Sequence, residues 1–221
     1  MSARFFVLYL LSCILSTAAS LKCQGCFSSV EECRNEDMEL VNCKPDENYC
    51  LSLSFWSTMM PLPLSFTFKS CATADQCSEG YYSFTTLVKK HLQRRIACCE
   101  SDACNTAPLP IPGRDLLKPN GFVCPGSYEE NGSSVESGPV LCLGDEDQCF
   151  NAKYTGTALS VYTSAIVVQG CTRKNGCAYP IGDTEQGHGL LRFTLEKMEC
   201  QNPERLEGWN SFSKTFRWGW N

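Results

Sequence analysis

The chain has 221 residues, of which 17 are cysteine and 2 are histidine, and it carries a formal net charge of -5. An acidic chain lacks the cationic field that phosphate contacts require, so nucleic-acid binding is not expected. A reducing cytosol would leave the thiols free, so this cysteine content indicates an oxidising compartment. The scarcity of histidine disfavours mixed cysteine–histidine zinc sites, and neither a metal nor a cofactor is expected.

Residues 1–20 have the layout of a secretory signal peptide. Arg4 precedes an apolar run of residues 5–15, and small residues precede a cleavage site before Leu21. An N-terminal anchor helix is the alternative, but the run is too short to span a bilayer. Cleavage would also remove Cys13, which leaves 16 cysteines, the even number that full pairing requires. We therefore expect a secreted, extracellular protein.

The remaining cysteines form two groups on either side of a proline-rich, cysteine-free segment. The spacing Cys43-x6-Cys50-x20-Cys71-x5-Cys77-x20-Cys98 returns as Cys142-x6-Cys149-x21-Cys171-x5-Cys177-x22-Cys200. Two such similar runs indicate an internal duplication. The expected organisation is a first domain at 21–106 with ten cysteines, a connector at 107–122, a second domain at 123–201 with six cysteines, and a C-terminal tail at 202–221.

Alternating apolar and polar residues predict β-strands with one buried face. Residues 51–55 and 64–68 show this period of two, and residues 81–88 and 190–195 have strand-like composition. Prolines between 59 and 63 favour a loop there. No long amphipathic helix is evident after residue 20, so the chain is expected to be all-β.

The first domain opens with Leu21-Lys22-Cys23-Gln24-Gly25-Cys26 and closes with Cys98-Cys99-Glu100-Ser101-Asp102-Ala103-Cys104-Asn105. This LxCxxC opening and CCxxDxCN closure resemble the three-finger (snake-toxin-like) domain of the lymphocyte-antigen and urokinase-receptor (UPAR/Ly6) family. Cysteine spacing alone cannot choose among the possible connectivities. The resemblance implies the pairs Cys23–Cys50, Cys26–Cys33, Cys43–Cys71, Cys77–Cys98 and Cys99–Cys104, and then Cys124–Cys149, Cys142–Cys171 and Cys177–Cys200. The second domain lacks counterparts of two of these bridges.

The order of ten and then six cysteines is similar to that of gamma-type phospholipase A2 inhibitors, as is the start of the second domain at residues 117–126. This resemblance implies a secreted, non-enzymatic protein that inhibits secreted phospholipase A2 by covering the face with which the enzyme meets lipid. A secreted signalling or pheromone-like ligand of sodefrin type and a receptor-like three-finger protein are the alternatives. The C-terminus shows no hydrophobic stretch of a glycolipid-anchor signal, so no membrane anchor is expected.

Three segments are candidates for contact with a protein partner. They are the apolar loop of the second finger, the apolar connector and a basic stretch on the third finger. The alternatives are packing on the neighbouring domain, a plain spacer and a solvated charged loop, respectively. The residues are Trp56, Met59, Met60, Leu62 and Leu64; Leu109, Ile111, Leu116 and Leu117; and Lys89, Lys90, Arg94 and Arg95.

Three further expectations complete the sequence-based picture. Asn131 begins a glycosylation sequon. No catalytic residues are expected, because no nucleophile motif accompanies His188. The first finger is acidic while the third is basic, which suggests head-to-tail homo-oligomers as a further hypothesis. The aromatic C-terminal tail offers no physical basis for a functional assignment.

Overall fold

The computed structural model describes residues 20–206, except for 30–31, 60–62, 88–89, 114–115, 134–136, 159–161, 180, 187–188 and 190. The expected signal peptide, apart from Ser20, and residues 207–221 of the tail lie outside this description. Regular structure in the described part is nearly all β-strand. None of its helices is long and apolar enough to cross a bilayer.

The first domain consists of three β-hairpins. They are β1 (Lys22–Ser28) with β2 (Glu39–Asn42), β3 (Tyr49–Ser57) with β4 (Leu64–Ala72), and β5 (Gly80–Thr86) with β6 (His91–Cys99). Strand β1 also pairs with β4, and β3 also pairs with β6. Three 3-10 turns lie between or after the strands: η1 (Asn35–Asp37), η2 (Ala74–Gln76) and η3 (Cys104–Thr106).

The second domain repeats this plan with longer strands. Its hairpins are β7 (Pro119–Glu130) with β8 (Ser137–Leu143), β9 (Gln148–Ala158) with β10 (Tyr162–Thr172), and β11 (Gly182–Gln186) with β12 (Leu191–Gln201). Strand β7 pairs with β10, and β9 pairs with β12, as β1 and β3 do in the first domain. The short helix α2 (Lys174–Cys177) follows β10. The predicted fold class, two tandem three-finger domains, is confirmed.

Disulfides hold the base of each domain. The eight bridges are Cys23–Cys50, Cys26–Cys33, Cys43–Cys71, Cys77–Cys98, Cys99–Cys104, Cys124–Cys149, Cys142–Cys171 and Cys177–Cys200, the same pairs that the family resemblance implies. The cysteines of the central pairs are buried among themselves in both domains. Covalent links of this kind stabilise small domains whose hydrophobic cores are limited.

A short strand closes the second domain where the first domain has its last bridge. Strand β13 (Glu204–Arg205) pairs with β7, with Glu204 opposite Val123. The guanidinium of Arg205 lies 5.2 Å from the centre of the Phe122 ring. This pairing falls in the segment that the sequence assigns to the tail, so ordered structure continues past Gln201.

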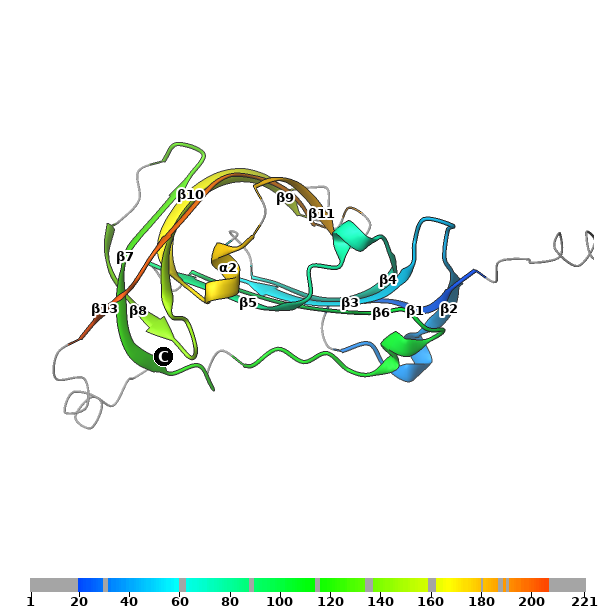
Figure 1. Cartoon of the computed structure of the whole chain (residues 1–221). Coiled ribbons are helices and arrows are strands. Elements are labelled where there is room, and N and C mark those ends of the chain that lie inside the picture. Colours follow the sequence, from blue (N-terminus) through cyan, green and yellow to red (C-terminus); the bar gives the residue numbers. More distant parts are fainter. Residues whose placement is uncertain are drawn as a thin grey trace, which may run out of the picture.

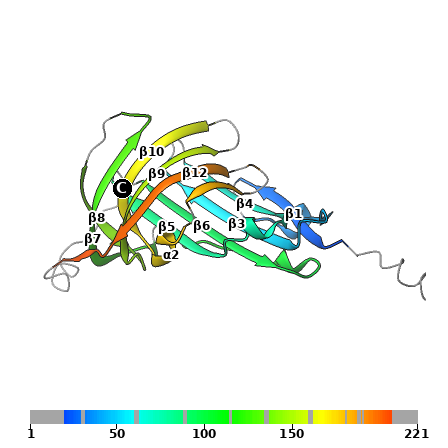
Figure 2. The same cartoon turned by 45° about the horizontal axis from the view of Figure 1, so that its top comes forward.

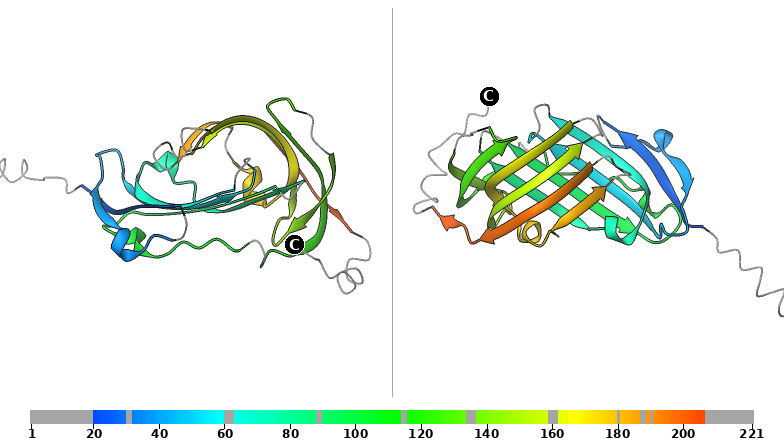
Figure 3. Two further views of the ribbon diagram at one scale, coloured as in Figure 1. Left: turned by 180° about the vertical axis from the view of Figure 1, so that it is seen from behind. Right: turned by 90° about the horizontal axis from the view of Figure 1, so that it is seen from above.

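The two domains share a single sheet of 13 strands. Its main path runs β11-β12-β9-β10-β5-β6-β3-β4-β1-β2, and the pairing of β10 with β5 joins the domains. The second domain curves into an arch over the flatter strands of the first (Figures 1 and 2). Seen from above, its yellow to orange strands cross over the cyan to green strands of the first domain (Figure 3).

The hydrophobic core follows this arrangement. One buried cluster, which includes Leu51, Leu53 and Phe66, lies within the first domain. A larger cluster lies between the domains and includes Met59 and Tyr82 from the first and residues of β7, β9, β10 and β12 from the second. The interface between the domains therefore forms a large part of the apolar interior of the molecule.

We call the contact of residues 84–86 in β5 with residues 170–172 in β10 the interdomain seam. A Cβ atom at Gly170 would lie 2.0 Å from the backbone oxygen of Thr85, far inside van der Waals contact. Beside it, the Thr172 hydroxyl donates a hydrogen bond to the backbone oxygen of Ser83 at 2.9 Å. The close approach of the two strands therefore requires glycine at position 170.

Replacing Gly170 with alanine should open the interdomain seam. Overpacking of this kind costs about 1–3 kcal/mol, so hydrogen exchange of the amides at residues 170–172 should accelerate about tenfold or more. Gly138→Ala is the matched control, since its Cβ would meet only a side-chain carbon of Leu87 at 3.9 Å. Unchanged protection in Gly170→Ala would show that the seam can accommodate a side chain.

Candidate protein-binding surface

Strand alternation gives the shared sheet two different faces. Neighbouring residues in a strand point to opposite sides. In β6, Arg94 lines the space under the arch, while Arg95 is exposed and contacts the connector on the other side. In β3, Phe55 and Ser54 divide in the same way. One face of the sheet therefore meets the second domain, and the other meets the connector.

The connector is fastened along this outer face. The Ser54 hydroxyl donates a hydrogen bond to the backbone oxygen of Leu109 at 2.6 Å, and Nη1 of Arg95 donates to that of Pro110 at 2.9 Å. Figure 1 shows the connector, in green, passing beneath the sheet on its way from η3 to β7. Strand β7 already begins at Pro119, inside the segment that the sequence assigns to the connector. The proline-rich segment is therefore held against the first domain over its first residues.

A buried lysine fixes the start of the connector. Nζ of Lys69 donates hydrogen bonds to the backbone oxygens of Asn105, Thr106 and Ala107, each at 2.8 Å. Burial lowers the pKa of Lys69 from its ordinary value, and the charge of Glu32 partly opposes this effect. Three carbonyl acceptors partly replace the water that this ammonium group loses.

The closing motif of the first domain acts beside this lysine. The side-chain amide of Asn105 accepts a hydrogen bond from the backbone nitrogen of Gln24 at 2.9 Å and donates to the backbone oxygens of Gln24 and Leu51. Asp102 accepts a hydrogen bond from the backbone nitrogen of Lys22. The aspartate and asparagine of CCxxDxCN therefore bind the end of the domain to β1 and β3, directly before the connector starts.

The predicted connector residues differ in exposure. Leu116 is 70% exposed, which makes it one of the most exposed large apolar residues described. Leu109, Ile111 and Leu117 are half-buried. An exposed leucine next to a fastened backbone is a feature that a protein partner can recognise with little loss of conformational entropy.

The second-finger residues are not gathered in an exposed loop. Met59 was expected to be exposed, but it is only 3% exposed and belongs to the core between the domains. The reason is that the arch of the second domain covers the end of this hairpin, as the alternative of interdomain packing anticipated. Trp56 and Leu64 are half-buried. Met60 and Leu62 lie outside the described residues.

The basic stretch is likewise divided. Arg94 was expected on a charged loop surface, but it is 4% exposed, and its guanidinium lies 4.5 and 4.7 Å from the ring centres of Tyr82 and Tyr179. Lys90 donates to the backbone oxygen of Met59 and lies over a ring of the second domain. The cations are drawn into the domain interface because aromatic faces attract them. Arg95 is exposed, and Lys89 lies outside the described residues.

Asn131 lies at an exposed turn after β7. Its backbone has a φ of 53°, and its side-chain oxygen accepts a hydrogen bond from the backbone nitrogen of Ala165 at 2.9 Å. This bond uses the amide oxygen and does not use the nitrogen to which a glycan would attach. Glycosylation at Asn131 stays a prediction.

The cysteine clusters offer no metal site in this state. Two groups of three sulfur atoms lie close together, Cys23, Cys43 and Cys71 in the first domain and their counterparts in the second. Each of these cysteines is in a disulfide. A metal ligand must be a free thiolate.

A buried glutamate is the feature that sequence reasoning missed. Glu146 has no exposed surface, and one of its side-chain oxygens accepts hydrogen bonds from the hydroxyls of Ser83 at 2.6 Å and Thr85 at 2.8 Å. The Thr85 hydroxyl also lies 2.7 Å from Nδ1 of the buried His91. A carboxylate of the second domain is therefore bound by two hydroxyls of the first, next to the interdomain seam.

The internal duplication contained the signal for this contact. In each domain a glutamate lies four residues after a cysteine, Glu47 after Cys43 and Glu146 after Cys142. Both side chains accept a hydrogen bond at 2.9 Å from the backbone nitrogen three residues earlier. Glu47 also pairs with exposed Lys44. The same turn thus serves a local role in one domain and an interdomain role in the other.

Known proteins match both domains. Residues 21–106 match the family model described as phospholipase A2 inhibitor, and residues 120–204 match the u-PAR/Ly-6 domain. The B-type gamma chain of the phospholipase A2 inhibitor from Elaphe quadrivirgata is 28% identical over 163 residues, which cover 74% of this chain and 79% of that protein. The A-type gamma chain from Elaphe climacophora is 27% identical over 203 residues, which cover 90% and 96%. The inhibitor named PIP of Malayopython reticulatus is 26% identical and covers 87% and 92%.

Among solved structures, mouse TEX101 overlaps 82% of this chain and 97% of its own, with a TM-score of 0.34 and 17% identity. The strand pairing, the bridges and the two domain matches define a protein of the tandem three-finger class. By domain content, the chain belongs to the phospholipase A2 inhibitor and u-PAR/Ly-6 families.

Replacing Lys69 with methionine should release the start of the connector. Three backbone oxygens would lose their charged donor, and such bonds contribute about 1.5–3 kcal/mol. We expect hydrogen exchange at residues 105–113 to accelerate about tenfold. Lys153→Met is the control, because that lysine forms an ion pair at the surface. Equal exchange in wild type and Lys69→Met would contradict the role assigned to Lys69.

The buried Glu146 should make stability depend on pH. Burial raises the pKa of Glu146 from 4.5 to about 7, against the opposing effect of its hydrogen bonds. Between these two values the folded protein keeps a proton that the unfolded chain has lost, so stability should fall as pH rises from about 4.5 to 7. The full difference corresponds to about 3 kcal/mol.

Chemical unfolding of the disulfide-intact protein at pH 5 and pH 7.5 measures this difference. Glu146→Gln should remove most of the pH dependence, because the amide cannot ionise. Glu47→Gln changes the corresponding residue of the first domain and should leave the dependence as in wild type. If Glu146→Gln retained the wild-type difference between the two pH values, another group would be responsible.

Proposed function

We propose that the chain is a secreted, non-enzymatic protein that binds and inhibits secreted phospholipase A2 by protein–protein contact. Relatives that cover most of the chain are named as inhibitors of that enzyme, and the first domain matches their family model. The observation that carries the proposal is the connector, which presents exposed Leu116 near the end of a segment that Ser54 and Arg95 fasten to the first domain.

The proposed mechanism is steric. The outer face carrying the connector covers the surface with which the enzyme meets aggregated lipid, so that substrate is excluded while the enzyme's chemistry is untouched. A fastened, extended backbone and exposed apolar side chains suit such a contact, because binding then orders few additional residues. Arg95 adds a positive charge at the same place, which favours an acidic partner surface.

The test is a titration of the full secreted protein against several secreted phospholipases A2. Complex formation is measured by calorimetry and activity on micelles. We expect submicromolar affinity for at least one enzyme and strong inhibition on micelles, with weaker inhibition on a short-chain monomeric substrate that does not require the interfacial face. Absence of binding at micromolar concentration would overturn the proposal.

A matched pair of variants locates the contact. Leu116→Asp places a charge in the proposed interface and should weaken binding about tenfold or more. Ile181→Asp alters a residue that is 59% exposed but lies away from the connector, and it should bind as the wild type does. Equal affinities for the two variants would place the contact elsewhere on the molecule.

A further inference from the structure

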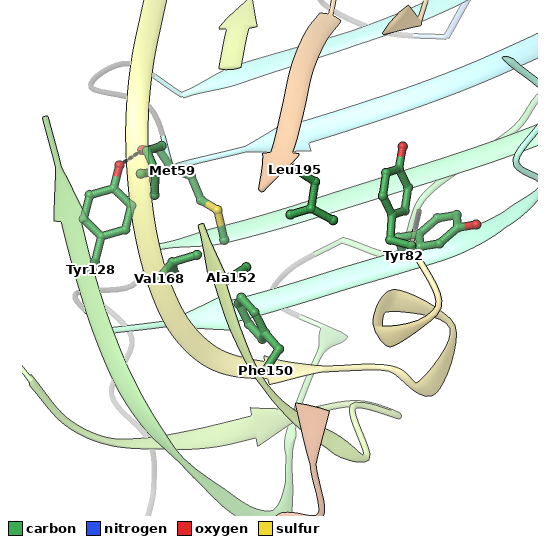
Figure 4. Close-up of a cluster of buried hydrophobic side chains, with 9 residues drawn as sticks. Met59, Tyr82, Tyr128, Phe150, Ala152, Val168 and Leu195 are labelled. Carbon is green, nitrogen blue, oxygen red and sulfur yellow. Dashed lines mark hydrogen bonds between the residues drawn. The ribbon is translucent and has the colours of Figure 1, made fainter. Parts of the chain in front are cut away.

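An apolar cavity lies between the arch of the second domain and the flatter sheet of the first. Side chains from β3, β5 and β6 form one wall, and side chains from β9, β10 and β12 form the other. Figure 4 shows Met59, Phe150, Ala152 and Val168 coming together from both domains. The cavity therefore exists only when the two domains are docked.

The cavity arises from strand alternation and from small residues. Every second residue of β9, from Phe150 to Gly156, and of β10, from Ser164 to Val168, faces inward. Ala152 and Gly156 fill little of the space that larger neighbours would occupy, so the two walls do not close completely. The volume that remains is about 140 Å³.

The size and lining of the cavity favour a hydrocarbon. A well-studied engineered cavity of about 150 Å³, lined by aliphatic and aromatic residues, stays dry and binds benzene. Here the walls are formed mostly by aromatic and aliphatic side chains such as Phe84, Leu92 and Ile166. One short alkyl chain would gain contacts with both walls without displacing ordered polar partners.

The charged groups at the cavity favour an anion. Of the described residues that line it, the two charged ones are Arg94 and Arg192, and both are cationic. Arg94 is held in place by the rings of Tyr82 and Tyr179, and its Nη1 donates to the Tyr179 hydroxyl at 2.7 Å. A carboxylate beside a preorganised guanidinium forms a charge-assisted contact that an alcohol cannot match.

We propose that this interdomain cavity binds a medium-chain fatty acid, with the hydrocarbon between the two walls and the carboxylate toward Arg94. The ligand would contact both domains at once and so would favour their docked state. This activity is distinct from phospholipase inhibition, because it uses the inner face of the sheet and needs no enzyme.

The test compares three probes of equal chain length on the full secreted protein. Octanoate, octanol and octylammonium are titrated by calorimetry below their critical micelle concentrations. We expect octanoate to bind at least tenfold more tightly than octanol and octylammonium to bind weakest of the three. Equal binding of octanoate and octanol would overturn the assignment of the carboxylate to Arg94. No octanoate binding at millimolar concentration would overturn the site itself.

Two substitutions locate the binding site. Ala152→Phe fills the cavity from a buried position in β9 and should reduce octanoate affinity about tenfold or more. Ala165→Phe adds the same side chain at an exposed position in β10 and should leave affinity unchanged. Equal octanoate affinity in Ala152→Phe and wild type would place the ligand elsewhere. The comparison of the three wild-type titrations stands even if Ala152→Phe fails to fold.

Discussion

The pairing of β5 with β10 determines the architecture of the whole molecule. Two three-finger domains joined by a connector have no inherent reason to share a sheet, but here the edge of one hairpin meets the edge of another. The contact is possible because Gly170 presents no side chain to the backbone of Thr85. Once this edge is paired, β9, β10 and β12 must curve over the first domain. The arch, the interdomain core and the cavity beneath it all follow.

Internal duplication explains why this contact is asymmetric. Both domains retain the cysteine-anchored turn with its glutamate, and both use that side chain to close the turn. Only Glu146 also meets Ser83 and Thr85 of the other domain. Loss of solvent raises its pKa, while the hydroxyl donors keep the burial tolerable. A repeated structural unit thus became part of the contact between the two repeats.

Cysteine spacing and strand alternation predicted the fold because both are local or covalent constraints. They identified two domains and the hairpins around residues 51–55 and 64–68, and family resemblance added the bridges. The candidate surface was harder to predict. Alternation says that Arg94 and Arg95 face opposite sides of a strand, but it does not say what covers each side. Met59 and Arg94 were therefore expected at the surface, although the second domain covers both. The buried Glu146 was missed for the same reason.

The two faces of the shared sheet are physically separable. Ser54 and Arg95 hold the connector on one side, and their neighbours Phe55 and Arg94 line the cavity on the other. A side chain that points outward from β3 or β6 contributes nothing to the inner wall, so substitutions can alter one face with little effect on the other. Changes to the backbone path differ, because a shift of either strand moves both of its faces together. Variants that alter only outward side chains therefore distinguish a role of the connector surface from a role of the cavity.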